Sequence, residues 1–165
     1  EPDAAAGLAH NRNLHAHWSL SMHTPVSQLL QMKGTQIYAV APQDSVYEAV
    51  RRMSEYGIGA LVVLDGDTLA GIVSERDYAR KVVLQGRQSK ETPVADIMTR
   101  NVYTTAPTQT VRDCMKLMTE RKIRHLPVVD DGRVIGMLSI GDLVKQIITT
   151  QQAQIEQLQN YIAGQ

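Results

Sequence analysis

The chain has 165 residues, enough for one compact domain or for two half-domains that share a core. Its 17 basic and 17 acidic side chains cancel and aromatic residues make up 4%, which argues against nucleic-acid binding. The single cysteine, Cys114, excludes an internal disulfide and a cysteine-based metal cluster and fits a reducing cytoplasm. No apolar run reaches the length of a membrane span or a secretory core, so we expect a cytoplasmic protein without a membrane partner.

The first 23 positions mix alanine, asparagine, serine and histidine without a steady period, and we interpret residues 1–23 as an arm or an added extension. His15 and His17 have a spacing that can bind metal on a strand, but no companion carboxylates are near, and we predict no metal site. A leading helix is expected over residues 24–34, because Thr24 has the form of an N-cap followed by proline.

Residues 35–84 contain the first group of predicted elements. Ser45 and Glu48 form a capping-box pattern, and a continuous apolar run suggests a buried strand after the helix that they open. The expected order is a strand over 37–40, a helix over 45–57, strands over 60–64 and 69–73 around a turn, and a helix over 74–84.

A polar stretch, residues 85–93, is the predicted linker, and residues 94–149 then repeat the same order. Thr110 and Asp113 form another capping-box pattern. The expected elements are a strand over 102–104, a helix over 110–121, strands over 126–129 and 134–138, and a helix from residue 139.

The two groups are an internal duplication, because residues 71–77 (Gly-Ile-Val-Ser-Glu-Arg-Asp) recur 65 positions later (136 minus 71) as Gly-Met-Leu-Ser-Ile-Gly-Asp. Each copy has the order strand, helix, strand, strand, helix, and neither is large enough to fold stably by itself. We therefore predict an α/β (α+β) fold in which two tandem repeats pack as one pseudo-twofold module with two related clefts.

The last helix is predicted to continue as a C-terminal helical extension over residues 150–165. Its apolar positions follow a heptad-like spacing with Gln151 at a core position: Val144, Ile148, Ile155, Leu158 and Ile162. An amphipathic helix on its own domain would give a similar pattern. We favour a homodimer, because so narrow a line of apolar residues on a terminal helix is typical of contact with another chain.

Three segments of the second copy carry a resemblance to a known family: 96–99 (Asp-Ile-Met-Thr), 123–130 (Ile-Arg-His-Leu-Pro-Val-Val-Asp) and 136–142. With the duplication, they resemble a paired cystathionine-β-synthase (CBS) domain module of the stand-alone type. The resemblance implies a regulatory sensor that binds an adenosine-containing ligand such as AMP, ADP, ATP, NAD(H) or S-adenosylmethionine. The first copy departs from this pattern at residues 59–62, so the two clefts need not be equivalent.

The resemblance further implies that Asp77 and Asp142, with Ser74 and Ser139 of the same motif, hold the ribose. A carboxylate only accepts hydrogen bonds and has two oxygens, so it suits a ribose diol. The same Ser-x-x-Asp pattern is also a capping box, in which the aspartate caps only its own helix. Both roles are compatible with one residue.

Phosphate is expected to meet Arg76, at a helix N-terminus, and Arg124 with His125, which in this family's pattern lie near the centre of the module. The alternatives are a solvated ion pair for Arg76 and a satisfied imidazole for His125. Pairing across the pseudo-twofold places the opening residues of one copy by the aspartate of the other. The Asp77 cleft is predicted to contain Ile72, Met98, Asn101 and Tyr103 beside Arg124 and His125, and its counterpart Lys33, Gln36, Tyr38 and Met137. Ile58, Ala60 and Ile123 are further predicted base-pocket residues.

No nucleophile with its base, carboxylate pair or metal cluster is assembled by spacing, so we predict no enzyme and no catalytic cofactor. The leading hypothesis is a nucleotide sensor that modulates an unidentified protein. A structural dimerisation module without a ligand and a nucleic-acid-binding regulator are the alternatives.

Overall fold

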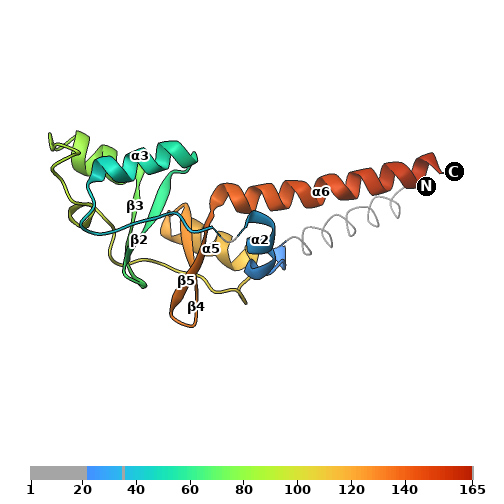
Figure 1. Ribbon diagram of the computed structural model, residues 1–165. Helices are drawn as coiled ribbons and strands as arrows, with labels where there is room; N and C mark the ends of the chain where they lie inside the picture. The colour runs from blue at the N-terminus through green and yellow to red at the C-terminus, as the bar shows by residue number, and fades with distance from the viewer. Residues whose placement is uncertain (1–21, 35, 165) are drawn as a thin grey trace. The chain divides into compact units, whose positions relative to one another are not determined.

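The computed structural model describes residues 22–34 and 36–164 (Figure 1). The predicted arm, including His15 and His17, therefore lies outside the described residues except for its last two positions. The chain divides into two compact units. Unit 1 contains the residues up to Gly34 together with Pro107–Arg124 and Leu138 onward, and unit 2 contains Thr35–Ala106 and His125–Met137.

The predicted duplication is visible in the secondary structure. Helix α3 spans Val46–Tyr56 and α5 spans Val111–Arg121, strands β2 and β4 span Ala60–Asp65 and His125–Asp130, and β3 and β5 span Thr68–Ser74 and Arg133–Ser139. Every boundary in the second copy lies 65 positions after its counterpart (111 minus 46, 125 minus 60, 133 minus 68). The mixed α and β fold with two repeats is therefore confirmed.

The copies exchange their opening segments. In unit 1, Pro25 bridges Thr110 at the start of α5, and in unit 2, Pro93 bridges Ser45 at the start of α3. The four backbone hydrogen bonds on these bridges measure 2.8–2.9 Å, namely Val26 N to Gln109 O, Val111 N to Thr24 O, Val94 N to Asp44 O and Val46 N to Thr92 O. Each compact unit thus joins the opening of one copy to the first helix of the other, which is why the units differ from the sequence repeats.

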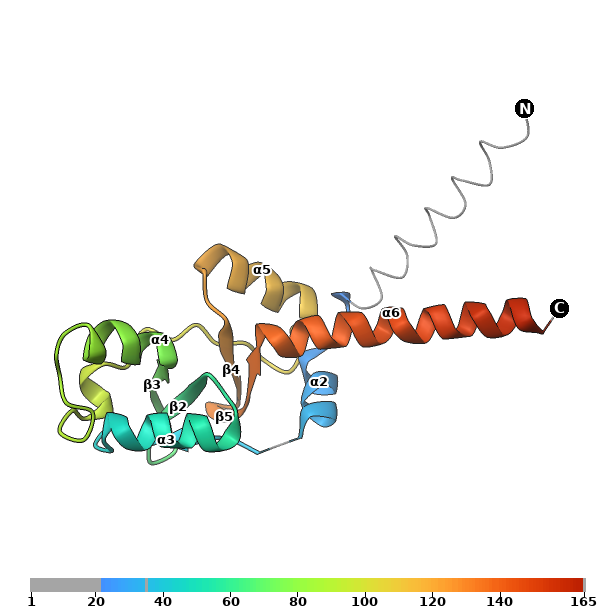
Figure 2. The same cartoon turned by 90° about the horizontal axis from the view of Figure 1, so that it is seen from above.

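Unit 2 is built on a sheet in which β2 lies between β1 (Ala39–Val40), to which it is parallel, and β3, to which it is antiparallel. Figure 2 shows α3 beside this sheet. One face of α3 and alternate residues of β2 enter a single core with the segment that opens the second copy: Val46, Ala49, Met53, Leu61, Val63, Val94, Ile97 and Met98. All of Ala60–Val63 is buried, as expected for a continuous apolar strand.

After β3 the chain is helical, as α4 (Glu75–Tyr78) and then a π-helical stretch over Ala79–Val83. The predicted single helix is thus interrupted by a π-type turn, a feature that often occurs at functional sites. A short 3₁₀ turn, Val94–Asp96, leads into the second copy. Strands β4 and β5 form a two-stranded sheet.

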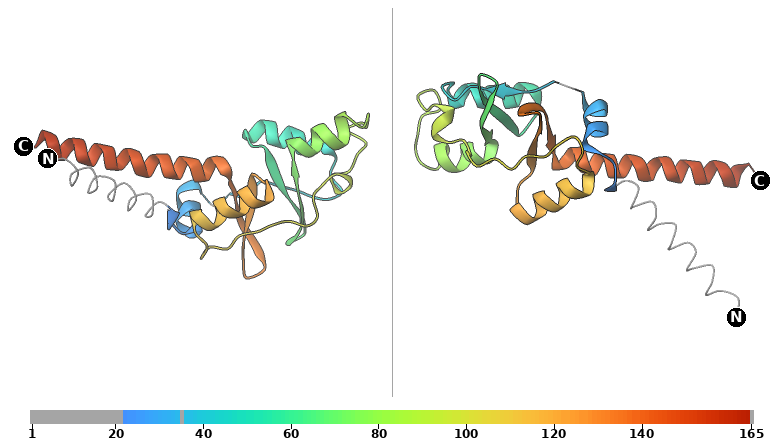
Figure 3. Two further views of the ribbon diagram at one scale, coloured as in Figure 1. Left: turned by 180° about the vertical axis from the view of Figure 1, so that it is seen from behind. Right: turned by 90° about the horizontal axis from the view of Figure 1, so that it is seen from below.

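The described residues of unit 1 include three helices: α2 (Val26–Lys33), α5 and the long α6 (Ile140–Ala163). Figure 3 shows α6 running well past α2 and α5. All three helices contribute buried side chains: Val26, Leu29, Leu30, Val111, Cys114, Met118, Leu143 and Ile147. Leu138, near the end of β5, is also buried in this unit. None of the helices among the described residues combines the length and the apolar character that a membrane span requires.

Two predictions about the chain's local structure are wrong. Residues 102–104 are not a strand, because the chain bends at Arg100 and Asn101 and pairs only at Thr105, which bridges Val128 in parallel. Helix α2 begins after Pro25 rather than at it, because the bridge to Thr110 holds Pro25 in an extended conformation (φ −71°, ψ 149°).

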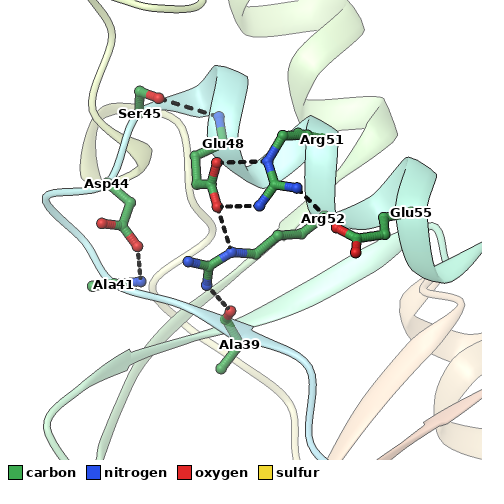
Figure 4. Close-up of polar contacts among 8 residues, drawn as sticks. All are labelled: Ala39, Ala41, Asp44, Ser45, Glu48, Arg51, Arg52 and Glu55. Carbon is green, nitrogen blue, oxygen red and sulfur yellow. Dashed lines mark hydrogen bonds and ion pairs between the residues drawn. The ribbon is translucent and has the colours of Figure 1, made fainter.

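The predicted capping box of α3 is only half formed (Figure 4). Ser45 Oγ accepts a hydrogen bond from Glu48 N at 3.1 Å, but the Glu48 carboxylate accepts hydrogen bonds from Arg51 and Arg52 instead, at 2.8–2.9 Å. Hydrogen bonds from these guanidinium groups, Arg51 first, lower the pKa of Glu48 to about 2. Arg52 also donates to Ala39 O, which ties α3 to β1. The arginines therefore remove the glutamate from its predicted cap.

Candidate functional site

The last strand of each copy, β3 or β5, which we call its closing strand, ends in a complete capping box at the N-terminus of the next helix. We call these two helix N-termini the α4 mouth and the α6 mouth. At the α4 mouth, Asp77 Oδ2 accepts hydrogen bonds from Ser74 N at 2.9 Å and Ser74 Oγ at 3.0 Å, and Asp77 N donates to Ser74 Oγ at 3.2 Å. The other carboxylate oxygen of Asp77 lies 3.0 Å from Lys81 Nζ. Asp77 is 9% exposed, so the α4 mouth holds a buried carboxylate with a lysine on its second oxygen.

The second copy's opening segment runs along β3 just before this mouth. Ile72 and Thr99 exchange two backbone hydrogen bonds, of 3.0 and 2.9 Å, and Lys81 Nζ donates to Ile97 O at 2.8 Å. Gly71 permits this approach, because a Cβ at that position would lie 2.7 Å from Thr99 O and 2.9 Å from Met98 Sδ. The structure therefore brings the predicted pocket residues Ile72 and Met98 together, on the strand that leads to Asp77.

His125 is the first residue of β4. A Cβ placed on Gly59 would be 3.8 Å from His125 Cε1 and 3.8 Å from Glu75 Oε2, so this glycine leaves room beside both side chains. Glu75 N also donates to Gly59 O at 3.1 Å. In unit 1 the equivalent bond runs from Ile140 N to Arg124 O at 2.9 Å. The imidazole of His125 is therefore in the same unit as Asp77, and it lies near the same glycine as the carboxylate of Glu75, the first residue of α4.

The α6 mouth repeats the capping box but has a different cation. Asp142 Oδ2 accepts from Ser139 N at 2.8 Å, and Asp142 N donates to Ser139 Oγ at 3.1 Å. Lys33 Nζ, at the end of α2, lies 2.7 Å from the same Oδ2. The opening helix of the first copy thus reaches the aspartate of the second, as the predicted exchange requires.

Lys33 also sets the acidity of Asp142. Burial alone would raise the pKa of this carboxyl, but hydrogen bonds from Lys33 and from Ser139 outweigh burial and hold the pKa below the ordinary value of 3.8. The Asp142 side chain is 27% exposed, compared with 12% for Asp77. The α6 mouth is therefore the more open of the two, and its cation comes from another helix.

The remaining predicted residues fall into three groups. Arg76, Asn101 and Tyr103 are exposed in unit 2, where Ile58 is half-buried and Ala60 is fully buried. Arg124 is exposed in unit 1, whereas Asp77 is in unit 2, so the place of Arg124 in the Asp77 cleft stays a prediction; Ile123 is half-buried in unit 1. Three residues predicted for the Asp142 site belong to unit 2, so their place near Asp142 stays a prediction: Gln36, Tyr38 and Met137.

Sequence reasoning missed Lys81. The residue follows Asp77 by four positions, a spacing that places opposite charges together on a helix, and this signal was available in the sequence. Lys81 connects the carboxylate of Asp77 to the backbone of the second copy at Ile97. It is therefore a positioning residue of the α4 mouth.

One further hollow of the described residues contains no predicted site residue. A shallow depression of about 390 Å³ lies over α3, lined by Tyr47, Val50, Arg51, Ser54 and Glu55, and contains none of the predicted site residues. In residues 22–34 and 36–164, no group of three or more His, Cys, Asp or Glu side chains is arranged to hold a metal ion. The two mouths thus remain the candidate sites.

Comparison with relatives of known sequence identifies the family. The chain is 41% identical over 150 residues to the CBS domain-containing protein CBSX3, mitochondrial, of Arabidopsis thaliana, covering 86% of this chain and 73% of that protein. It is 31% identical over 119 residues to the CBS domain-containing protein YhcV of Bacillus subtilis, covering 72% and 84%. Because the plant relative is mitochondrial by name, the cytoplasmic location stays a prediction.

Solved structures agree. A protein from Burkholderia ambifaria, described as a signal-transduction protein with CBS domains, is 56% identical with a TM-score of 0.74, covering 76% of this chain and 95% of that one. A CBS domain pair in complex with 5′-methylthioadenosine and S-adenosyl-L-methionine is 28% identical with a TM-score of 0.66, covering 74% and 94%. The CBS domain family itself matches residues 26–84 and 94–149. This chain therefore belongs to the CBS domain family and carries a pair of these regulatory domains.

Proposed function

We propose that this CBS pair is a sensor that binds an adenosine-containing ligand at the mouths of α4 and α6, where Asp77 and Asp142 accept the ribose hydroxyls. One observation carries the proposal: each closing strand delivers an aspartate, already fixed by a serine, to a helix N-terminus. The relative solved with two adenosine compounds supports the ligand class.

Capping and ribose binding are compatible because a carboxylate offers about four lone-pair positions. In both mouths the serine bonds only to Oδ2, through its backbone amide and, at the α4 mouth, through its hydroxyl as well. This bond fixes the orientation of the carboxylate without a ligand, so less rotational entropy is lost on binding. Ser74 and Ser139 are therefore positioning residues, and the aspartates are the groups that touch the ribose.

Phosphate groups are assigned to Arg76, Arg124 and His125. Arg76 lies in the first turn of α4, where the helix dipole also favours an anion. The second copy has Gly141 at the matching position, so its mouth lacks this charge. We therefore expect the α4 mouth to prefer a phosphorylated ligand such as AMP, ADP, ATP or NAD(H), and the α6 mouth to accept an uncharged nucleoside portion.

The ligand is expected to be sensed rather than consumed, with the signal passed to a regulated protein. A structural module without a ligand is the second candidate, and one observation favours it: Lys81 and Lys33 already pair with the two aspartates. The side chains of these lysines are 45% and 39% exposed, and exposed ion pairs contribute about 0–1 kcal/mol, which a ligand can displace.

Calorimetry with AMP and adenosine tests the proposal. A charge-assisted contact to phosphate is worth about 1.5–3 kcal/mol, or one to two decades in affinity. Arg76→Ala and Arg124→Ala should therefore weaken AMP binding far more than adenosine binding, whereas Arg112→Ala, an exposed change on α5, should affect neither. Chromatography should recover the nucleotide intact. The assignment would be contradicted if neither ligand bound to the wild type. It would also be contradicted if the arginine variants lost the same affinity for AMP as for adenosine.

A further inference from the structure

The distal half of α6 presents apolar side chains that the described residues leave exposed. Ile148, Ile155, Leu158 and Ile162, which we call the seam residues, are 58%, 48%, 59% and 72% exposed. Leu143 and Ile147, by contrast, are buried within unit 1. From residue 155 to residue 164 every position is exposed. The seam residues therefore lie on a length of helix that extends beyond the buried core of unit 1.

Such a segment is a poor helix by itself. It is rich in glutamine, and isolated helices of about 12–15 residues are marginal in water even for the best sequences. The CBS domain match ends at residue 149, so the segment is not a part of the repeats. A partner is needed to account for both the helix and its apolar line.

The seam residues have the pattern of a parallel two-stranded coiled coil. Ile148, Ile155 and Ile162 are seven positions apart and take heptad position a, while Leu158 takes position d. Isoleucine at a with leucine at d favours two parallel strands. Gln151 occupies the preceding d position, and a single polar core residue is a known device for fixing register.

The lack of charge beside the seam residues indicates which partner α6 has. The e and g positions beside the seam are uncharged, namely Gln152, Gln154, Gln159 and Tyr161, and Glu156 is the single charged residue after Lys145. A basic or acidic partner would find no complementary charges, whereas a second copy meets no like-charge repulsion. We propose that α6 pairs in parallel and in register with α6 of a second copy over residues 144–162, with Gln151 facing Gln151.

Sedimentation of the full chain at tens of micromolar tests the pairing. The wild type should be a dimer. Ile155→Lys combined with Leu158→Lys should weaken association by more than about a hundredfold, because four apolar side chains lose their burial per dimer. Gln157→Lys combined with Asn160→Lys adds the same charge at the same spacing on the outer face, and it should leave the dimer intact.

Disulfide trapping tests the orientation. Under mild oxidation, Leu158→Cys should cross-link two copies, because parallel in-register helices place equivalent d positions opposite each other, whereas the outward Gln157→Cys should not. A monomeric wild type would overturn the proposal. The proposal would also be overturned if the variant with Ile155→Lys and Leu158→Lys were still a dimer.

Discussion

The two helix mouths share one motif but differ in the source of their cation. Asp77 pairs with Lys81, one turn along its own helical segment, while Asp142 pairs with Lys33 from α2. The first mouth is therefore closed by a local contact that forms with the helix. The second depends on a contact between residues 109 positions apart in the sequence.

This difference shows how a duplicated motif acquires two behaviours. Backbone and capping geometry are repeated almost without change, since Ser74 N and Ser139 N lie 2.9 and 2.8 Å from their aspartates. The two mouths differ in the lysine that pairs with the aspartate, which is Lys81 for Asp77 and Lys33 for Asp142. Under the proposed function, a ligand at Asp142 would compete with a lysine from another helix, whereas a ligand at Asp77 would compete with a lysine of the same helical segment.

The largest expected effect on stability comes from adding a side chain at Gly71, where β3 and the second copy's opening segment lie close together. Gly71→Ala would place a Cβ 2.7 Å from a backbone oxygen of Thr99, so β3 and the second copy's opening segment must separate. We expect a loss of about 1–3 kcal/mol in the free energy of unfolding, measured by urea denaturation.

Gly141→Ala is the matched control at the second mouth. Its Cβ would meet only Ser139 Oγ, at an ordinary 3.5 Å, and alanine favours the helix, so we expect a gain of about 0.4–1 kcal/mol. Equal destabilisation by the two substitutions would show that the approach at Gly71 is not special.

Removing each aspartate should expose the asymmetry directly. Asp77→Ala leaves Ser74 N and Lys81 without their buried acceptor and should cost about 2 kcal/mol, while Asp142→Ala, at the more exposed mouth, should cost about 1 kcal/mol. Thermal unfolding of both variants measures the difference. A larger loss at Asp142 would reverse our ranking of the two mouths.

The smallest effect concerns pH and Lys33. Because Lys33 lowers the pKa of Asp142 below 3.8, the unfolded chain takes up this proton first as the pH falls, and the stability from the pair is present above pH 3.8 and lost below it. Lys33→Met should therefore cost up to about 1 kcal/mol at pH 6 and flatten the decline below pH 4.

Denaturant unfolding at several pH values checks this expectation. Lys116→Met is the matched control, since Lys116 lies 3.9 Å from Glu120 in an exposed pair on α5. If Lys33→Met and Lys116→Met have identical pH profiles, Lys33 does not govern the titration of Asp142.

The sequence predicted most of the fold because its signals were local and duplicated. The capping motifs at Ser74, Thr110 and Ser139 all formed, and the fixed offset of the copies placed the strands. Sequence reasoning failed where tertiary contacts intervene, as when the arginines beside Glu48 displace it from the cap and the Thr105 bridge replaces a strand. For the candidate site, the motif predicted that both carboxylates lie at helix N-termini, but the ion pair between Lys33 and Asp142 joins distant parts of the sequence and could not be predicted from spacing.

The ribose assignment rests on distinguishing a cap that binds ligand from a cap that does not. The helix α5 provides the internal reference, because Thr110 and Asp113 form a complete capping box with bonds of 2.9, 2.9 and 3.2 Å, yet Asp113 is not at a mouth that follows a closing strand. Asp113→Ala therefore removes a cap without removing a proposed ribose contact.

Calorimetry with AMP and 2′,3′-dideoxy-AMP on three proteins is the most direct test. The wild type and Asp113→Ala should bind AMP at least about tenfold more tightly than the dideoxy ligand, because hydrogen bonds to a charged group contribute about 1.5–3 kcal/mol. In the Asp77→Ala, Asp142→Ala double variant both ligands should bind equally weakly, since the lost hydroxyls and the lost carboxylates are partners. A double variant that still prefers AMP would show that these aspartates only cap their helices.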